Sequence, residues 1–106
     1  MISWERVDEL RSEIGEDVFG EIVEVFLEEI AEAMARLQQG AALESLKADL
    51  HFVKGCALNL GFRSLAGACA EAEASPGAET TAAVVDIYER SKSTFLDRVG
   101  LVTEPA

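Results

Sequence analysis

The amino-acid sequence predicts an all-α protein, an antiparallel four-helix bundle preceded by a short N-terminal capping helix. Ala, Glu and Leu, all of which favour helices, dominate a chain of 106 residues with only eight Gly and two Pro. Apolar residues make up 49% of the chain and recur at three- and four-residue steps, which is the spacing of one helix face. Short connections between long amphipathic helices favour antiparallel neighbours. The length fits one core, so we expect residues 1–106 to form a single domain.

The first predicted helix is short and runs from roughly Ser3 to Ile14. Ser3 is a suitable N-cap, and Val7, Leu10 and Ile14 share one face. Gly15 follows and ends the helix.

The second predicted helix runs from about Glu16 to Gln39, with Gly40 as its C-cap. Apolar residues at three- and four-residue steps form its core-facing stripe. These residues are Phe19, Ile22, Val23, Phe26, Ile30, Ala33, Met34 and Leu37. Its many glutamates lie mostly off this stripe, so we interpret them as a solvated face.

The third predicted helix covers about Ala42 to Leu60, and Gly61 stops it. An apolar seam faces the neighbouring helices. The seam consists of Leu43, Leu46, Leu50, Val53, Ala57 and Leu60. The fourth helix begins at Phe62 or Arg63 and ends near Ala74, and its many small residues allow helix axes to approach closely.

The fifth predicted helix follows the loop of residues 75–79 and runs from about Thr80 to Val99. We expect one face to point inward. This face consists of Val84, Ile87, Tyr88, Ser91, Phe95 and Val99. Residues 101–106 are expected to be frayed.

The composition excludes several function classes. A formal net charge of −11 disfavours nucleic acid and anionic membrane surfaces as partners. No segment approaches 18 uncharged apolar residues, and the first ten residues contain no apolar signal core, so we expect a cytoplasmic protein that does not cross a membrane. The two cysteines, Cys56 and Cys69, are too few for a disulfide framework, and we expect free, buried thiols.

The only histidine of the chain, His51, lies in the stretch DLHFVKGCALNLGF of the third helix. His51 is one residue, or about 100°, away from the seam residue Leu50, so it should lie on a flank that solvent reaches. Lys47, Lys54 and Gly55 share its face at helical spacing. The two ammonium groups would stabilise an anion bound at the imidazole.

Gly55 is unexpected inside a helix, where glycine costs roughly 1 kcal/mol relative to alanine. Its presence makes sense if a large partner must approach His51. Leu58 and Phe62 continue the same face and predict an exposed apolar docking patch. The segment from Arg36 to Arg63 holds four bases and two acids, so the docking region is locally basic and includes Lys47 and Arg63.

A carboxylate partner for His51 follows from the predicted hairpin of the third and fourth helices. Residues equally distant from the turn at Gly61 lie at similar height, which places Glu73 opposite His51 and Cys69 opposite Cys56. Glu73 could accept a hydrogen bond from Nδ1–H and leave Nε2 free as a nucleophile.

This stretch resembles the motif of the histidine-containing phosphotransfer (HPt) domain family. The family pattern has His, then Lys three positions on, Gly at the fourth, a small residue at the fifth, and a later Gly before an aromatic or apolar residue. The chain supplies His51, Lys54, Gly55, Cys56, Gly61 and Phe62 in this order. The predicted helices are similar to the family's four-helix bundle over nearly the whole chain.

The resemblance implies phosphorelay signalling in two-component signal transduction. His51 would accept a phosphoryl group at Nε2 from the aspartyl phosphate of a response-regulator receiver domain, or pass one on. Lys54 would screen the phosphoryl oxygens, and Gly55 would let the receiver approach closely. We expect a phosphocarrier with no cofactor and no kinase or ATPase activity of its own, because the chain has no GxxxxGK[ST] loop, and any Mg²⁺ would belong to the receiver.

Several alternatives stay open at this point. Many shuttles of the family resemble one another in having glutamine where this chain has Glu73, whereas glutamate is reminiscent of phosphoacceptor domains attached to chemotaxis-type kinases. The donor is therefore a receiver or a sensor histidine kinase, and the chain is a free-standing shuttle or part of a larger kinase. A bundle that binds a signalling partner without chemistry, or one with a merely structural histidine, is the main rival. A zinc site is disfavoured by the spacing of His51, Cys56 and Cys69.

Overall fold

The computed structural model describes residues 2–40 and 42–100, and these residues form five α-helices and no strands. The all-α prediction is confirmed. The helices are α1 (Trp4–Ile14), α2 (Glu16–Gln38), α3 (Leu43–Leu60), α4 (Arg63–Ala74) and α5 (Ala78–Val99). Each boundary lies within two residues of the predicted one, and the segment expected to be frayed, 101–106, lies outside the described residues.

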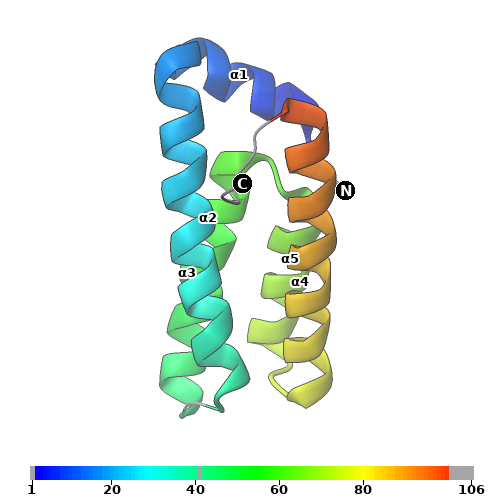
Figure 1. The fold of residues 1–106 in the computed structure, drawn as a ribbon. Coiled ribbons are helices and arrows are strands. Elements are labelled where there is room, and N and C mark those ends of the chain that lie inside the picture. The colour runs from blue at the N-terminus through cyan, green and yellow to red at the C-terminus, as the bar shows by residue number, and fades with distance from the viewer. Residues whose placement is uncertain (1, 41, 101–106) are drawn as a thin grey trace.

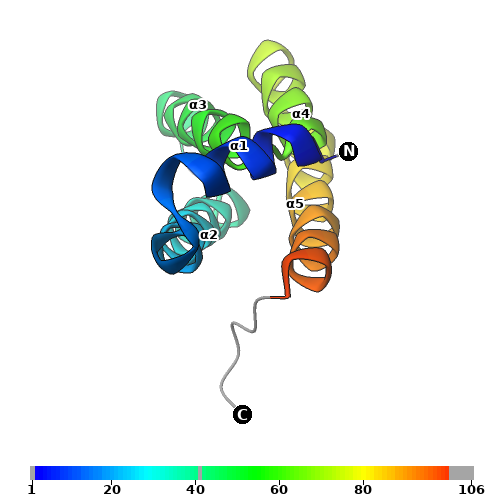
Figure 2. The ribbon, with the colours of Figure 1, turned by 90° about the horizontal axis from the view of Figure 1, so that it is seen from above.

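Helices α2 to α5 lie side by side along the long axis of the molecule, and each runs opposite to the helix before it (Figure 1). Seen along that axis, they occupy the corners of a quadrilateral in chain order, so α2 and α5 are also neighbours (Figure 2). Helix α1 crosses over one end of this arrangement and passes close to the turn between α3 and α4. The opposite end holds the α2–α3 and α4–α5 connections.

The end of α3 is the point where α1 attaches. Gly61 adopts a left-handed conformation with φ of 85°, and the backbone N–H of Ser3 donates to its carbonyl oxygen at 2.7 Å. The side chain of Ser3 accepts from the backbone N–H of Arg6 at 3.3 Å, so Ser3 is the N-cap of α1, as predicted. The same short segment therefore starts one helix and docks it on another.

The core contains most of the predicted apolar faces. The buried residues of α2 include six of its eight predicted stripe residues, and Ser91 on α5 is fully buried with a hydroxyl oxygen that has no hydrogen-bond partner. The other two stripe residues, Ile22 and Phe26, are half-buried. Leu43, the first residue of α3, is 55% exposed although it was predicted to face the core, and Leu27 is buried although it lies outside the predicted stripe. The hydroxyl of Tyr88 donates to the carbonyl of Leu27 at 3.2 Å and joins α5 to α2.

Within the described residues, no helix is long and apolar enough to cross a membrane.

Candidate functional site

His51 lies on the outer face of α3, and its side chain is 79% exposed. The seam residue Leu50, one position earlier, is completely buried, so the 100° step between them separates solvent from core. Lys47 is exposed and Lys54 is partly buried on the same face of the helix. A globular partner can therefore reach the imidazole without any rearrangement of the bundle.

Glu73 of α4 is the side chain that the structure brings to His51. Its Oε2 lies 3.8 Å from Nδ1 of His51, and the carboxylate is 28% exposed. This distance is within ion-pair range but too long for a hydrogen bond, so the predicted Nδ1–H bond is not formed in this conformation. The arrangement nevertheless leaves Nε2 on the side of the ring away from the carboxylate.

Gly55 has no packing role inside the protein. A Cβ built on it would meet no atom within 4 Å beyond its own chain neighbours and helix backbone, and the residue is exposed. Its carbonyl oxygen accepts a hydrogen bond from Nδ2 of Asn59 at 3.2 Å, which any residue at position 55 could also accept. The fold therefore gives no reason for a glycine at a position where alanine stabilises a helix by about 1 kcal/mol.

Phe62 is not part of an exposed patch, and this prediction is wrong. The side chain is completely buried and packs edge-to-face on Phe95 of α5, with ring centroids 5.2 Å apart. The reason is the left-handed turn at Gly61, which ends the helical repeat. The face of α3 therefore cannot be extended beyond Leu60, and the next side chain turns into the core.

The exposed apolar side chains near His51 are Leu58 and Phe52. Leu58 is 56% exposed and lies two turns along α3 from His51, as predicted. Phe52 is 42% exposed and directly follows His51, and the sequence pattern did not single it out. The signal for it is a large aromatic residue at a position off the seam formed by Leu50 and Val53.

The basic side chains of this region are not neutralised by nearby acids. Within residues 2–40 and 42–100, none of the ion pairs includes Lys47, Lys54 or Arg63. Arg63 is exposed at the start of α4. In a chain of net charge −11, three unpaired cations along the α3–α4 face form a local surface that attracts anions.

Asp49 and Arg36 join α3 to α2 one half-turn from His51. The Nε atom of Arg36 donates to both carboxylate oxygens of Asp49 at 3.2 Å, and its NH2 group donates to Oδ1 at 3.0 Å. The hydrogen bond to Asp49 raises the pKa of the Arg36 guanidinium above its ordinary value. This clamp uses two of the charges in the locally basic segment for structure rather than for binding.

Cys56 and Cys69 are free and buried, as predicted. Burial, with a smaller contribution from Glu73, raises the pKa of the Cys69 thiol to about 12, and the Lys54 ammonium opposes this shift. Burial and then Glu29 raise the pKa of the Cys56 thiol. Both thiols are protonated packing groups rather than nucleophiles.

The site therefore consists of an exposed histidine on a helical bundle, beside a carboxylate and unpaired lysines. Comparison with protein-family models matches residues 21–97 to the Hpt domain. The chain therefore belongs to the Hpt domain family, and membership implies phosphorelay signalling through histidine phosphotransfer. No curated protein and no solved structure gives a significant match to the chain.

Proposed function

We propose that His51 is the phosphoacceptor of the chain and that it exchanges a phosphoryl group with the aspartate of a response-regulator receiver domain. The observation that carries this proposal is the exposed imidazole with Glu73 on its Nδ1 side. Nε2 forms a bond to phosphorus while the bond from phosphorus to the aspartyl oxygen breaks. The positive charge that develops on the ring, with its proton on Nδ1, is stabilised by the Glu73 carboxylate.

Two lysines supply positive charge for the negatively charged phosphoryl group. Lys54 and Lys47 lie one turn to either side of His51 and are positioned to screen the phosphoryl oxygens. Phosphoryl transfer depends mostly on positioning and charge stabilisation, so an exposed helix face can serve as the site. In this proposal the chain needs no cofactor and has no kinase or ATPase activity, and Mg²⁺ is bound by the receiver.

We place the docking surface on the part of α3 between His51 and the α1 end of the bundle. Leu58 and Phe52 supply exposed apolar area, Gly55 leaves space between them, and Arg63 adds a cation at the edge. Such a patch with a charged margin is typical of protein interfaces. Phe52 replaces the buried Phe62 in this surface.

The immediate donor is a receiver domain or a sensor histidine kinase, and the chain acts in the cytoplasm as a free-standing carrier or as one domain of a larger kinase. The carboxylate at Glu73 leaves both donors possible, because it orients and stabilises the imidazole in the same way for either. The alternative is a bundle that binds a signalling partner without accepting phosphate. The unpaired Lys54 beside an exposed His51 favours the chemical role, since binding alone does not need this pair.

The test is incubation with receiver domains and sensor kinases phosphorylated with ³²P. The expected product is a labelled chain whose phosphate is labile in acid and stable in base, as phosphohistidine is. His51→Gln should abolish labelling while helicity measured by circular dichroism stays unchanged. Labelling of this variant would refute the assignment of His51, and a native chain that binds phosphorylated receivers without being labelled would favour the non-catalytic alternative.

A matched substitution tests the carboxylate. Glu73→Gln keeps the size of the side chain and removes its charge, and it should slow labelling without preventing it. Glu71→Gln, at an exposed position two residues away on α4, makes the same charge change and should leave the rate unaffected.

A further inference from the structure

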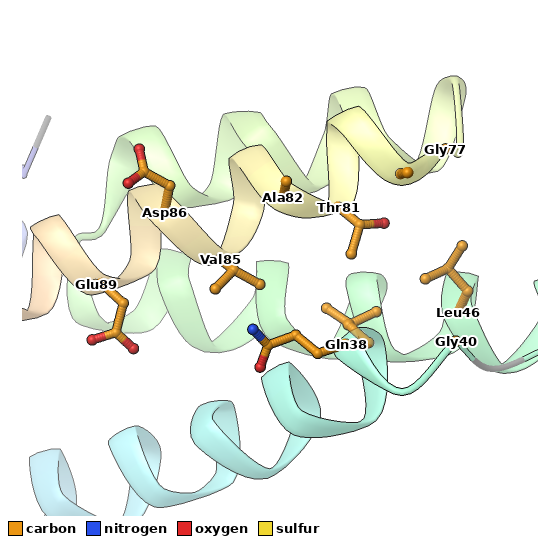
Figure 3. A pocket seen from close by; sticks show the side chains of 11 residues that line it. Gln38, Gly40, Leu46, Gly77, Thr81, Ala82, Val85, Asp86 and Glu89 are labelled. Atoms are coloured by element: carbon orange, nitrogen blue, oxygen red, sulfur yellow. The ribbon is translucent and has the colours of Figure 1, made fainter.

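The side of the bundle away from His51 carries an apolar groove. It has a volume of about 780 Å³ and lies between the end of α2, the start of α3 and the first half of α5 (Figure 3). His51 and Glu73 lie instead on the α3–α4 side. Ligand-binding clefts commonly have volumes of about 300–1,000 Å³.

The groove exists because small side chains face α2 over the first turns of α5. Ala78, Thr81, Ala82 and Val85 line this half of the helix, and none is large enough to reach α2. Further along α5, the buried Tyr88 donates a hydrogen bond from its hydroxyl to the Leu27 carbonyl and joins α5 to α2. The floor includes Leu37, which is buried, and Leu46, which is partly buried.

The charges at the groove are all of one sign. Asp86 and Glu89 are the only charged residues that line it, and no lining residue is basic. Asp86 is paired with Arg90 on the outer side of α5, whereas Glu89 belongs to no ion pair among residues 2–40 and 42–100 and points toward α2 (Figure 3). An occupant must therefore combine apolar groups with positive charge, in keeping with the chain's net charge of −11.

The shape of the groove favours a helix over a compact molecule. Its lining residues on α5 extend from Gly77 to Glu89, which corresponds to about 18 Å at 1.5 Å per residue. This is the length of about three helical turns. A partner helix in the groove would pack against α2 and α5 in the same way as the helices of the bundle pack against one another.

We propose that this groove binds a basic amphipathic helix of a partner protein. The apolar side chains of that helix pack against Leu37 and Val85, and its lysines or arginines meet the unpaired carboxylate of Glu89. This is the helix-in-groove mode of recognition. The inference does not rest on the role of His51, because the groove lies on another side of the bundle and shares no residue with that site.

The probe is a synthetic 14-residue helix with leucine at positions spaced by three and four and lysine elsewhere, compared with the same peptide carrying glutamate. Affinity is measured by fluorescence anisotropy, and the binding site by chemical-shift changes in nitrogen–proton spectra of the whole chain. We expect the lysine peptide to bind and to change the chemical shifts of residues 77–89 and 37–40. The glutamate peptide should bind at least tenfold more weakly.

Four variants separate groove binding from general attraction to an acidic protein. Glu89→Lys should weaken binding about tenfold, whereas Glu21→Lys, the same charge change on an exposed position of α2, should have little effect. Ala82→Phe should also weaken binding, because the ring fills the groove. His51→Gln should bind as the native chain does. Chemical-shift changes confined to the glutamates of α2 would overturn the proposal. Equal losses of peptide affinity in Glu89→Lys and Glu21→Lys would do the same. So would chemical-shift changes at the groove that arise from self-association of the chain without peptide.

Discussion

At the scale of single residues, Leu50 and His51 show how one helical step separates a core side chain from the exposed side chain proposed as the phosphoacceptor. Leu50 is buried and His51 is 79% exposed, although they are neighbours in the chain. The hairpin then brings Glu73 to the same height on α4, so the carboxylate comes from a helix that is fixed by its own packing. The phosphoacceptor role proposed for His51 needs no cavity, because in that proposal the receiver domain supplies the other reacting group.

Gly55 provides the sharpest test at this scale. Gly55→Gln should make the protein slightly more stable, by about 0.5 kcal/mol, because glutamine favours a helix and the position has open space around it. The same substitution should slow phosphoryl transfer from a receiver about 10- to 100-fold, since a side chain now stands beside His51 where the partner approaches. Thermal unfolding and single-turnover transfer measure the two effects.

Gly67 is the matched control for this experiment. It also lies inside a helix and is exposed, and a Cβ added to it would meet nothing within 4 Å. Gly67→Gln should raise stability by a similar amount and leave transfer unchanged, because α4 faces α5 at this position. A variant of Gly55 that transfers at the native rate would remove glycine from the proposed docking surface.

At the scale of helices, the turn at Gly61 determines both the end of α3 and the position of α1. A Cβ at this residue would come within 2.7 Å of the Ser3 carbonyl oxygen, in addition to the strain of a left-handed φ of +85°. Trp4, the only tryptophan, stacks on Phe95 at 6.1 Å and lies under the Arg98 guanidinium. The attachment of α1 can therefore be followed by tryptophan fluorescence.

We expect Gly61→Ala to displace α1 and shift the Trp4 emission to longer wavelength. Gly100→Ala has a similar positive φ of +73° with nothing within 4 Å, so it carries the backbone strain of about 1–2 kcal/mol without the clash. Gly61→Ala should melt at least about 5 °C below Gly100→Ala, which corresponds to roughly 1 kcal/mol more destabilisation. Equal melting temperatures with unchanged Trp4 emission would contradict the role of Gly61 as the docking point of α1.

The helices show where sequence patterns are sufficient and where they fail. Apolar periodicity predicted all five helices, and symmetry about the turn predicted that His51 and Glu73 lie together, because both depend on regular local geometry. The burial of Phe62 could not be predicted in this way, since a left-handed residue breaks the periodicity on which the prediction depends. The groove beside Val85 could not be predicted from the sequence pattern either, because it lies between α2 and α5, which are not consecutive in the chain.

At the scale of the whole molecule, two buried groups make the bundle sensitive to alkaline pH. Burial raises the pKa of Cys69 from 9.0 and that of Tyr88 from 10.0, in both cases to about 12. Both groups are neutral when protonated, and folding favours that form. Their contribution to stability is complete below pH 9 and is lost as the pH rises toward 12, because the unfolded chain releases these protons first.

We therefore expect the urea midpoint of unfolding to fall between pH 9 and pH 11.5, whereas between pH 6 and pH 8 these groups stay protonated and cause no change in the midpoint. Lysine deprotonation also makes this acidic protein more negative at high pH, so the native chain must be compared with a variant. Tyr88→Phe removes one of these titrations and should show a shallower fall than the native chain. It should also be less stable at pH 7 by about 1 kcal/mol, because the hydrogen bond to the Leu27 carbonyl is lost. Identical pH profiles for the two proteins would show that the Tyr88 hydroxyl keeps its ordinary pKa in the folded protein. Water would then reach this hydroxyl between α2 and α5.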